Sequence, residues 1–191
     1  MRDLKIFSIE DALQVVKHIP DALELLPKEF ITPEVCLAVV GNCSFALRDV
    51  PDELKTAELC LIAVQYKGWV LEHVPEELKT PELCFAAVEN CGFALEFVPE
   101  KLRTSEICIA AVISSSGEAL EYVPEELKTP EFYFAAVKQD GFALEFVPEE
   151  LKTLELCFAA VRNAGNASIF LPEKLKTLEF YFAVVQSAGD G

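Results

Sequence analysis

Apolar segments recur along the chain at a constant distance, and each is followed by the same proline and acidic positions. Residues 95–99 read Leu-Glu-Phe-Val-Pro, and residues 144–148 read the same. Steps of 24 residues, with a single step of 25, separate seven prolines in one register: Pro27, Pro51, Pro75, Pro99, Pro124, Pro148 and Pro172. A fixed period of roughly 20 to 50 residues is typical of a solenoid, in which each unit buries its apolar face against its neighbours.

Each unit begins with a sequence that predicts the start of a helix. In Thr80-Pro81-Glu82 the threonine is a good N-cap, the proline fits the first helical position, and the glutamate complements the helix dipole. The ladder of equivalent glutamates is therefore interpreted as capping rather than as a calcium or catalytic site. Residues 83–88 continue the helix and are apolar all round, which predicts a helix enclosed on several sides.

The second half of each unit predicts a shorter helix. A variable stretch that usually contains glycine closes the first helix, which suits the left-handed conformation of a helix C-terminus. The extra residue of the array lies among Ser114, Ser115 and Ser116, so this stretch is predicted to be an exposed loop. Residues 93–98 form the second helix and end before Pro99. Residues 99–102 then read as one 3-10 turn, with Leu102 pointing inward.

These features predict an all-α fold, an α-solenoid (superhelix) of about seven 24-residue two-helix repeats with a short 3-10 turn after the second helix. Ser8 and Asp11 resemble a capping box, so a helix over roughly residues 9–18 opens the chain. The expected organisation is an N-terminal segment 1–20 and a single solenoid domain 21–191. The last long helix starts at Leu178, and no cap is visible at the C-terminal end.

Charge and hydropathy narrow the function classes. Asp and Glu outnumber Lys and Arg by 32 to 16, a net charge of −16 that repels phosphate and argues against nucleic acid as a ligand. No apolar run approaches the ~20 residues that span a bilayer, so no membrane partner is expected. Residues 1–5 show no apolar signal segment, which predicts a cytoplasmic location; release as an effector by an unconventional route stays open.

The cysteines read as packing residues. Five of the seven share one repeat position, where the other units carry Tyr133 and Tyr181: Cys36, Cys60, Cys84, Cys108 and Cys157. An apolar position fits this exchange better than a metal ligand does, and buried free thiols in a reducing compartment are expected. With only two histidines and no zinc spacing, neither a metal site nor a cofactor is predicted.

Function is expected where the repeats differ on their surface. The loop before the second helix carries Tyr66 and Trp69, the only tryptophan. A second strip comprises the residues two before each register proline: Leu25, Asp49, His73, Phe97, Tyr122, Phe146 and Phe170. Its consecutive aromatic residues are either a binding ridge or a row of half-buried packing residues, and both interpretations stay open.

Two rows of charge accompany this strip. The acidic row is Glu24, Glu72, Glu96, Glu121 and Glu145, and the basic row is Lys55, Lys79, Arg103, Lys128, Lys152 and Lys176. The rows either interlock adjacent units or, for the acidic row beside the aromatic strip, receive a basic peptide.

Residues 119–131 (Ala-Leu-Glu-Tyr-Val-Pro-Glu-Glu-Leu-Lys-Thr-Pro-Glu) resemble a bacterial family of tandem helical repeats catalogued as a domain of unknown function. The likeness covers roughly residues 20–187. It implies an α-solenoid, and it implies no activity and no catalytic residues. The architecture is also similar to the leucine-rich variant α/3-10 solenoids.

The leading hypothesis is a non-enzymatic interaction scaffold whose acidic repeat surface binds a protein or peptide. The alternative is a structural self-assembly element that stacks through its C-terminal face. An enzyme is not expected, because the sequence contains no nucleophile–base pair and no phosphate-binding glycine loop.

Overall fold

The computed structural model describes residues 8–19 and 22–189, and within these ranges it contains helices and no strand. Its α-helices are α1 (Ile9–His18), α2 (Pro33–Asn42), α3 (Ala57–Tyr66), α4 (Pro81–Asn90), α5 (Ser105–Ser114), α6 (Pro130–Gln139), α7 (Leu154–Asn163) and α8 (Leu178–Gly189). The principal contacts join elements that are neighbours in the chain. The predicted all-α solenoid is therefore confirmed.

The second helix of each repeat is a 3-10 helix rather than an α-helix. These longer 3-10 helices are η1 (Ala22–Leu25), η3 (Ser44–Asp49), η5 (Gly68–His73), η7 (Gly92–Phe97), η9 (Glu118–Tyr122), η11 (Gly141–Phe146) and η13 (Gly165–Phe170). The proline two residues beyond each one limits its length, and a helix this short takes i→i+3 hydrogen bonds readily.

A second set of 3-10 turns follows the register prolines, as predicted: η2 (Lys28–Phe30), η4 (Asp52–Leu54), η6 (Glu76–Leu78), η8 (Glu100–Leu102), η10 (Glu125–Leu127), η12 (Glu149–Leu151) and η14 (Glu173–Leu175). Pro75, with φ −55° and ψ 141°, is extended and separates η5 from η6. A leucine ends every one of these turns except η2, which ends at Phe30, and each of these leucines is half-buried. The inward orientation predicted for Leu102 is therefore confirmed only in part.

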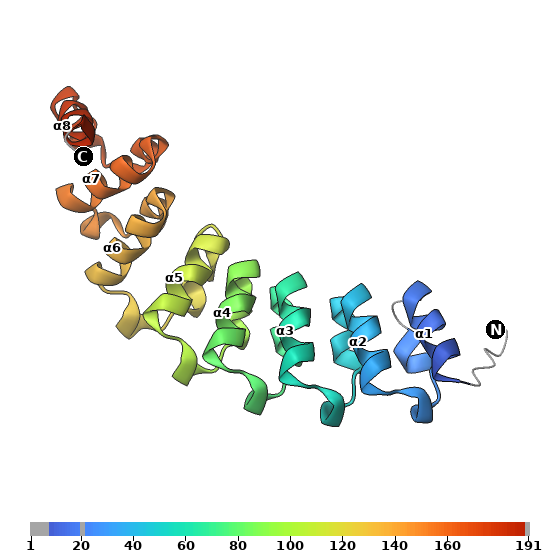
Figure 1. Ribbon diagram of the computed structural model, residues 1–191. Coiled ribbons are helices and arrows are strands. Elements are labelled where there is room, and N and C mark those ends of the chain that lie inside the picture. Colours follow the sequence, from blue (N-terminus) through green and yellow to red (C-terminus); the bar gives the residue numbers. More distant parts are fainter. Residues whose placement is uncertain (1–7, 20–21, 190–191) are drawn as a thin grey trace. The chain divides into compact units, whose positions relative to one another are not determined.

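The chain forms two compact units, Met1–Leu102 and Arg103–Gly191. Within the first unit α1 to α4 stand side by side in chain order, and within the second α5 to α8 follow one another in the same way (Figure 1). A single domain over residues 21–191 stays a prediction. The polar start over residues 1–5 and the predicted boundary between residues 20 and 21 lie outside the described residues.

Threonine caps fix where each α-helix of the array begins. Thr80 Oγ1 accepts the Leu83 N–H at 3.2 Å, and hydrogen bonds from its own backbone and from Thr80 lower the pKa of the Glu82 carboxyl. The same cap occurs at Thr32, Thr56, Thr104, Thr129, Thr153 and Thr177. Ser8 caps α1 by accepting the Asp11 N–H at 3.1 Å, so the predicted range of this helix is also confirmed.

Two of the glycines between the helices, Gly68 and Gly141, serve close packing rather than a left-handed turn. Gly68 and Gly141 have negative φ, contrary to the prediction, and both are buried. An alanine Cβ at Gly141 would lie 2.5 Å from the carbonyl oxygen of Ala160 in the next helix, and at Gly68 a Cβ would overlap the Ala87 carbonyl oxygen. Each glycine thus allows the next α-helix to approach the backbone.

An asparagine in the next repeat reinforces this approach. Asn90 Oδ1 accepts the Gly68 N–H at 2.8 Å, while its Nδ2 donates to the Gln65 carbonyl at 2.9 Å. Asn163 forms the same pair of hydrogen bonds with Gly141 (2.9 Å) and the Lys138 carbonyl (3.0 Å). The sequence analysis missed this asparagine clasp, because its two partners lie 22 and 25 residues away.

The inserted residue is absorbed by two residues of positive φ, Ser116 (50°) and Gly117 (84°). Ser115 is buried, and its hydroxyl donates to the Val112 carbonyl and accepts the Ala119 N–H. The prediction of a fully exposed loop is therefore wrong at Ser115. The hydroxyl replaces backbone hydrogen bonds that the insertion disrupts.

Candidate interaction surfaces

The predicted loop site places one aromatic ring in solvent and one in the array. Tyr66, at the end of α3, is 65% exposed. Trp69 is half-buried, and its ring stacks edge-on against Phe45 with centroids 4.1 Å apart. The tryptophan therefore joins neighbouring repeats of the first unit and is only partly available to a partner.

The predicted aromatic strip is half-buried at His73, Phe97, Tyr122 and Phe146. The Phe146 ring lies against Gly117, where a Cβ would overlap it. Phe170 packs edge-on against Phe142 with centroids 6.5 Å apart. Part of the strip therefore consists of half-buried packing residues, which was one of the two interpretations of its sequence.

The acidic row keeps its side chains in solvent. Glu72, Glu96, Glu121 and Glu145 are all exposed. Each precedes a member of the aromatic strip on the same 3-10 helix. Within each unit, the 3-10 helices therefore present exposed carboxylates beside half-buried rings. This surface is here called the 3-10 face.

The basic row has a structural task. Lys55 Nζ donates to the His73 carbonyl at 3.0 Å and pairs with the Asp52 carboxylate at 2.8 Å. Three further side chains of the basic row donate hydrogen bonds to carbonyls of the aromatic strip in the following repeat: Lys79 to Phe97, Arg103 to Tyr122 and Lys152 to Phe170. Four members of the basic row therefore join adjacent repeats through the carbonyl at the end of the next 3-10 helix.

The sequence analysis missed an apolar row on the opposite side of the repeats. The fifth residue of each α-helix in the array lies at the edge of the buried stripe; these residues, the helix-face row, are Leu37, Leu61, Phe85, Ile109, Phe134, Phe158 and Phe182. Leu37, Leu61 and Phe182 are 43%, 37% and 64% exposed, whereas Ile109 is buried. The helices are thus enclosed on several sides, as predicted, and one face is left partly open.

The packing explains which face stays open. Helix α4 contacts α3 on one side and η5 and η7 behind it, and α7 likewise contacts α6, η11 and η13. In α4 the buried residues are Leu83, Cys84, Ala87 and Val88. At 100° per residue these occupy one side of a helical wheel and leave the fifth position at its edge. A wheel drawn for one repeat would have located the row.

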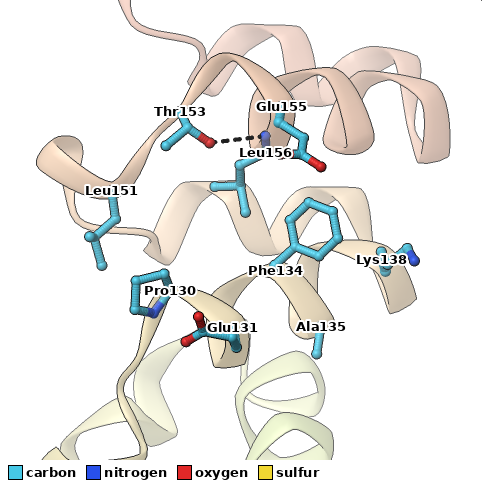
Figure 2. A pocket seen from close by; sticks show the side chains of 9 residues that line it. All are labelled: Pro130, Glu131, Phe134, Ala135, Lys138, Leu151, Thr153, Glu155 and Leu156. Atoms are coloured by element: carbon cyan, nitrogen blue, oxygen red, sulfur yellow. Dashed lines mark hydrogen bonds between the residues drawn. The ribbon is translucent and has the colours of Figure 1, made fainter.

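Within each unit, grooves lie between neighbouring α-helices on this face. The groove between α6 and α7 has a volume of about 430 Å³ and is lined by Pro130, Glu131, Phe134, Ala135, Lys138, Leu151, Thr153, Glu155 and Leu156. Figure 2 shows the Phe134 ring lying between the two helices, toward Leu156 and Glu155. Equivalent grooves lie between α2 and α3 (310 Å³), α5 and α6 (400 Å³), and α7 and α8 (320 Å³).

The charge of the α6–α7 groove is divided between its ends. Glu131 and Glu155 are exposed at the N-terminal end of their helices (Figure 2). At the other end Lys138 Nζ lies over the Phe134 ring, 5.5 Å from its centroid, a cation–π geometry. The groove therefore offers an apolar floor with an acidic rim on one side and a single lysine, stacked on that floor, on the other.

The thiols are structural. All seven cysteines are free, five of them are buried as predicted, and Cys43 and Cys91 are half-buried. Burial raises the pKa of Cys60, Cys84 and Cys108 to about 11, so these thiols are weak nucleophiles at neutral pH. Among the described residues, no three His, Cys, Asp or Glu side chains are grouped so as to hold a metal ion.

Comparisons with known proteins return one family. The model of the family described as "Domain of unknown function (DUF4116)" matches five overlapping windows, residues 32–79, 56–103, 80–128, 104–152 and 129–176. No curated protein and no solved structure matches the chain. In the part of the chain that the structure describes, no helix has the length and apolar character needed to span a membrane.

Proposed function

The chain belongs to the family described as Domain of unknown function (DUF4116), and we propose that it is a non-enzymatic interaction scaffold whose acidic repeat surface binds a protein or peptide. The observation that supports the proposal is the groove on the helix face, which recurs between four pairs of neighbouring α-helices with a similar apolar and acidic lining. Concave, largely apolar sites with a few polar groups at the rim are typical of ligand sites.

The charge of the chain favours a basic partner. A net charge of −16 attracts cationic segments and repels phosphate, so the proposal names a protein or peptide rather than a nucleic acid or a membrane. Lysines of the basic row are occupied within the array, as Lys55 illustrates, so they are less available to an acidic partner. Buried free thiols suit a reducing compartment, and a bacterial cytoplasmic location is part of the proposal.

The 3-10 face is the rival surface for the same function. Its 3-10 helices carry the predicted residues Trp69, His73, Phe97, Tyr122 and Phe146 and the carboxylates of Glu72, Glu96, Glu121 and Glu145, and Tyr66 lies at the end of α3, just before η5. Two of these rings, Trp69 and Phe146, pack within the array, which leaves fewer of the predicted side chains available to a partner on this face.

A capture experiment with two charge-reversed variants tests the proposal. Glu131→Lys with Glu155→Lys changes the helix face, and Glu121→Lys with Glu145→Lys makes the matched change on the 3-10 face of the same unit. A partner from the native source, identified by mass spectrometry and lost only with the first variant, supports the helix face. Loss only with the second variant places binding on the 3-10 face. A chain that captures no protein at low salt contradicts the scaffold function.

Self-assembly is the second candidate, and α8 carries the observation that favours it. Leu178, Phe182 and Val185 are 76%, 64% and 69% exposed, whereas Val161, the counterpart of Val185 in α7, is buried. Sedimentation velocity over a range of concentrations tests this candidate. A mass that rises with concentration, and that Val185→Glu returns to the monomer, supports stacking; a constant monomer mass refutes it.

A further inference from the structure

We infer that the helix-face grooves of the second unit bind an extended, basic peptide segment that presents one apolar and one basic side chain in every three residues. This inference rests on the proposed scaffold function and adds the chemistry of the partner. It concerns the grooves between α5 and α6, α6 and α7, and α7 and α8, each of which lies within residues 105–183.

The apolar side chain of each triplet is expected in the groove itself. In the α6–α7 groove the half-buried Phe134 ring and Leu151 form the sides, and Leu156, 3% exposed, forms the floor. In the next groove Phe158 and Leu175 take the equivalent places above Phe180. A volume of 320–430 Å³ lies within the range of small ligand sites and is open enough for a side chain to enter from the surface.

The basic side chain is expected at the acidic rim. Glu131, Glu155 and Glu179 line the three grooves, one carboxylate in each successive helix, and all three side chains are exposed. A full negative charge on each outweighs the roughly half positive charge of the helix N-terminus beside it. The rim therefore complements a row of lysine or arginine side chains rather than a row of carboxylates.

The period of three follows from the spacing of the helices. Packed helices lie about 8–10 Å apart. A polyproline-II chain advances about 3.1 Å per residue, so three residues cover about 9 Å. An extended segment that crosses successive helices consequently meets an equivalent groove and an equivalent carboxylate at every third residue. An α-helical ligand rises about 1.5 Å per residue and would need six residues for the same step.

The test uses a fluorescein-labelled peptide of four Leu-Lys-Pro triplets and the full chain, measured by fluorescence anisotropy. We expect binding that weakens about tenfold in the Glu131→Gln/Glu155→Gln variant, since two exposed ion pairs with the peptide are lost. The matched variant Glu121→Gln/Glu145→Gln on the 3-10 face should bind like the wild type. A peptide of the same composition with its residues reordered to remove the triplet should bind more weakly, and Leu-Glu-Pro triplets should not bind.

A second measurement separates this inference from the scaffold function. Selection of a random twelve-residue peptide library on the immobilised chain reports whether it binds peptides at all. Binders that lack a triplet pattern, binders with helical i, i+4 spacing, or loss of Leu-Lys-Pro binding in the 3-10 face variant overturn the triplet inference while leaving the scaffold function intact. A library that yields no binder, together with no binding of the triplet peptide, counts against both.

Discussion

The substitution Gly141→Ala tests whether the close contact between residue 141 and the backbone of helix α7 requires a glycine. The new Cβ would lie 2.5 Å from the Ala160 carbonyl oxygen and 2.9 Å from the Ala164 Cβ. Because the carbonyl belongs to helix α7, it cannot swing aside as a flexible side chain would. Gly165 occupies the same position in the following repeat, yet a Cβ there meets nothing within 4 Å, so it provides a matched control.

The expected cost follows from two contributions. Overpacking of a close backbone contact costs about 1–3 kcal/mol. Separation of the two segments also weakens the hydrogen bond from Gly141 N–H to Asn163 Oδ1, worth about 1 kcal/mol. Gly165→Ala should instead be neutral or stabilise by up to about 1 kcal/mol, because alanine restricts the unfolded chain. The two variants are therefore expected to differ by about 2–4 kcal/mol in the free energy of unfolding.

Urea unfolding followed by circular dichroism measures this difference. With a urea dependence of about 2 kcal/mol per molar, the midpoint of Gly141→Ala should lie about 1–2 M below that of Gly165→Ala. The comparison uses the transition of the whole array, because each repeat is stabilised by its neighbours. Equal midpoints for the two variants would show that the close contact at Gly141 does not require a glycine.

Three further predictions concern the contacts between repeats. Asn163→Ala removes both hydrogen bonds of the clasp and should lower the free energy of unfolding by about 2 kcal/mol, whereas Asn166→Ala, at an exposed position, should leave the urea midpoint unchanged. Lys79→Met leaves the Phe97 carbonyl without its donor and should cost about 1–3 kcal/mol, against no measurable change for the exposed Lys101→Met. Burial raises the pKa of the Cys60, Cys84 and Cys108 thiols to about 11 in the folded chain. The stability that these thiols contribute should be complete below the ordinary thiol pKa of about 8.5 and should fall as the pH rises from there toward 11. Melting temperatures that stay constant up to pH 11 would contradict this.

The sequence alone determined the fold class, because its strongest signals act over a few residues. The proline register, Thr80 with its equivalents and the apolar segment after each cap set where helices begin and end, and these local interactions repeat in every unit. The burial of five cysteines was likewise predictable. Another repeat carries Tyr133 at the same position, and a position that accepts either residue is typical of packing rather than of a metal ligand.

Tertiary structure decided which face of each repeat is open and what the polar side chains bind. The asparagine clasp joins Asn90 to Gly68, and the basic row joins Lys55 to the His73 carbonyl, across 22 and 18 residues. A local sequence pattern carries no information on such pairs, because their geometry depends on how adjacent repeats stack. The exposure of Phe134 follows from the same stacking: the neighbouring α-helices and the 3-10 helices cover three sides of α6 and leave the fourth to solvent.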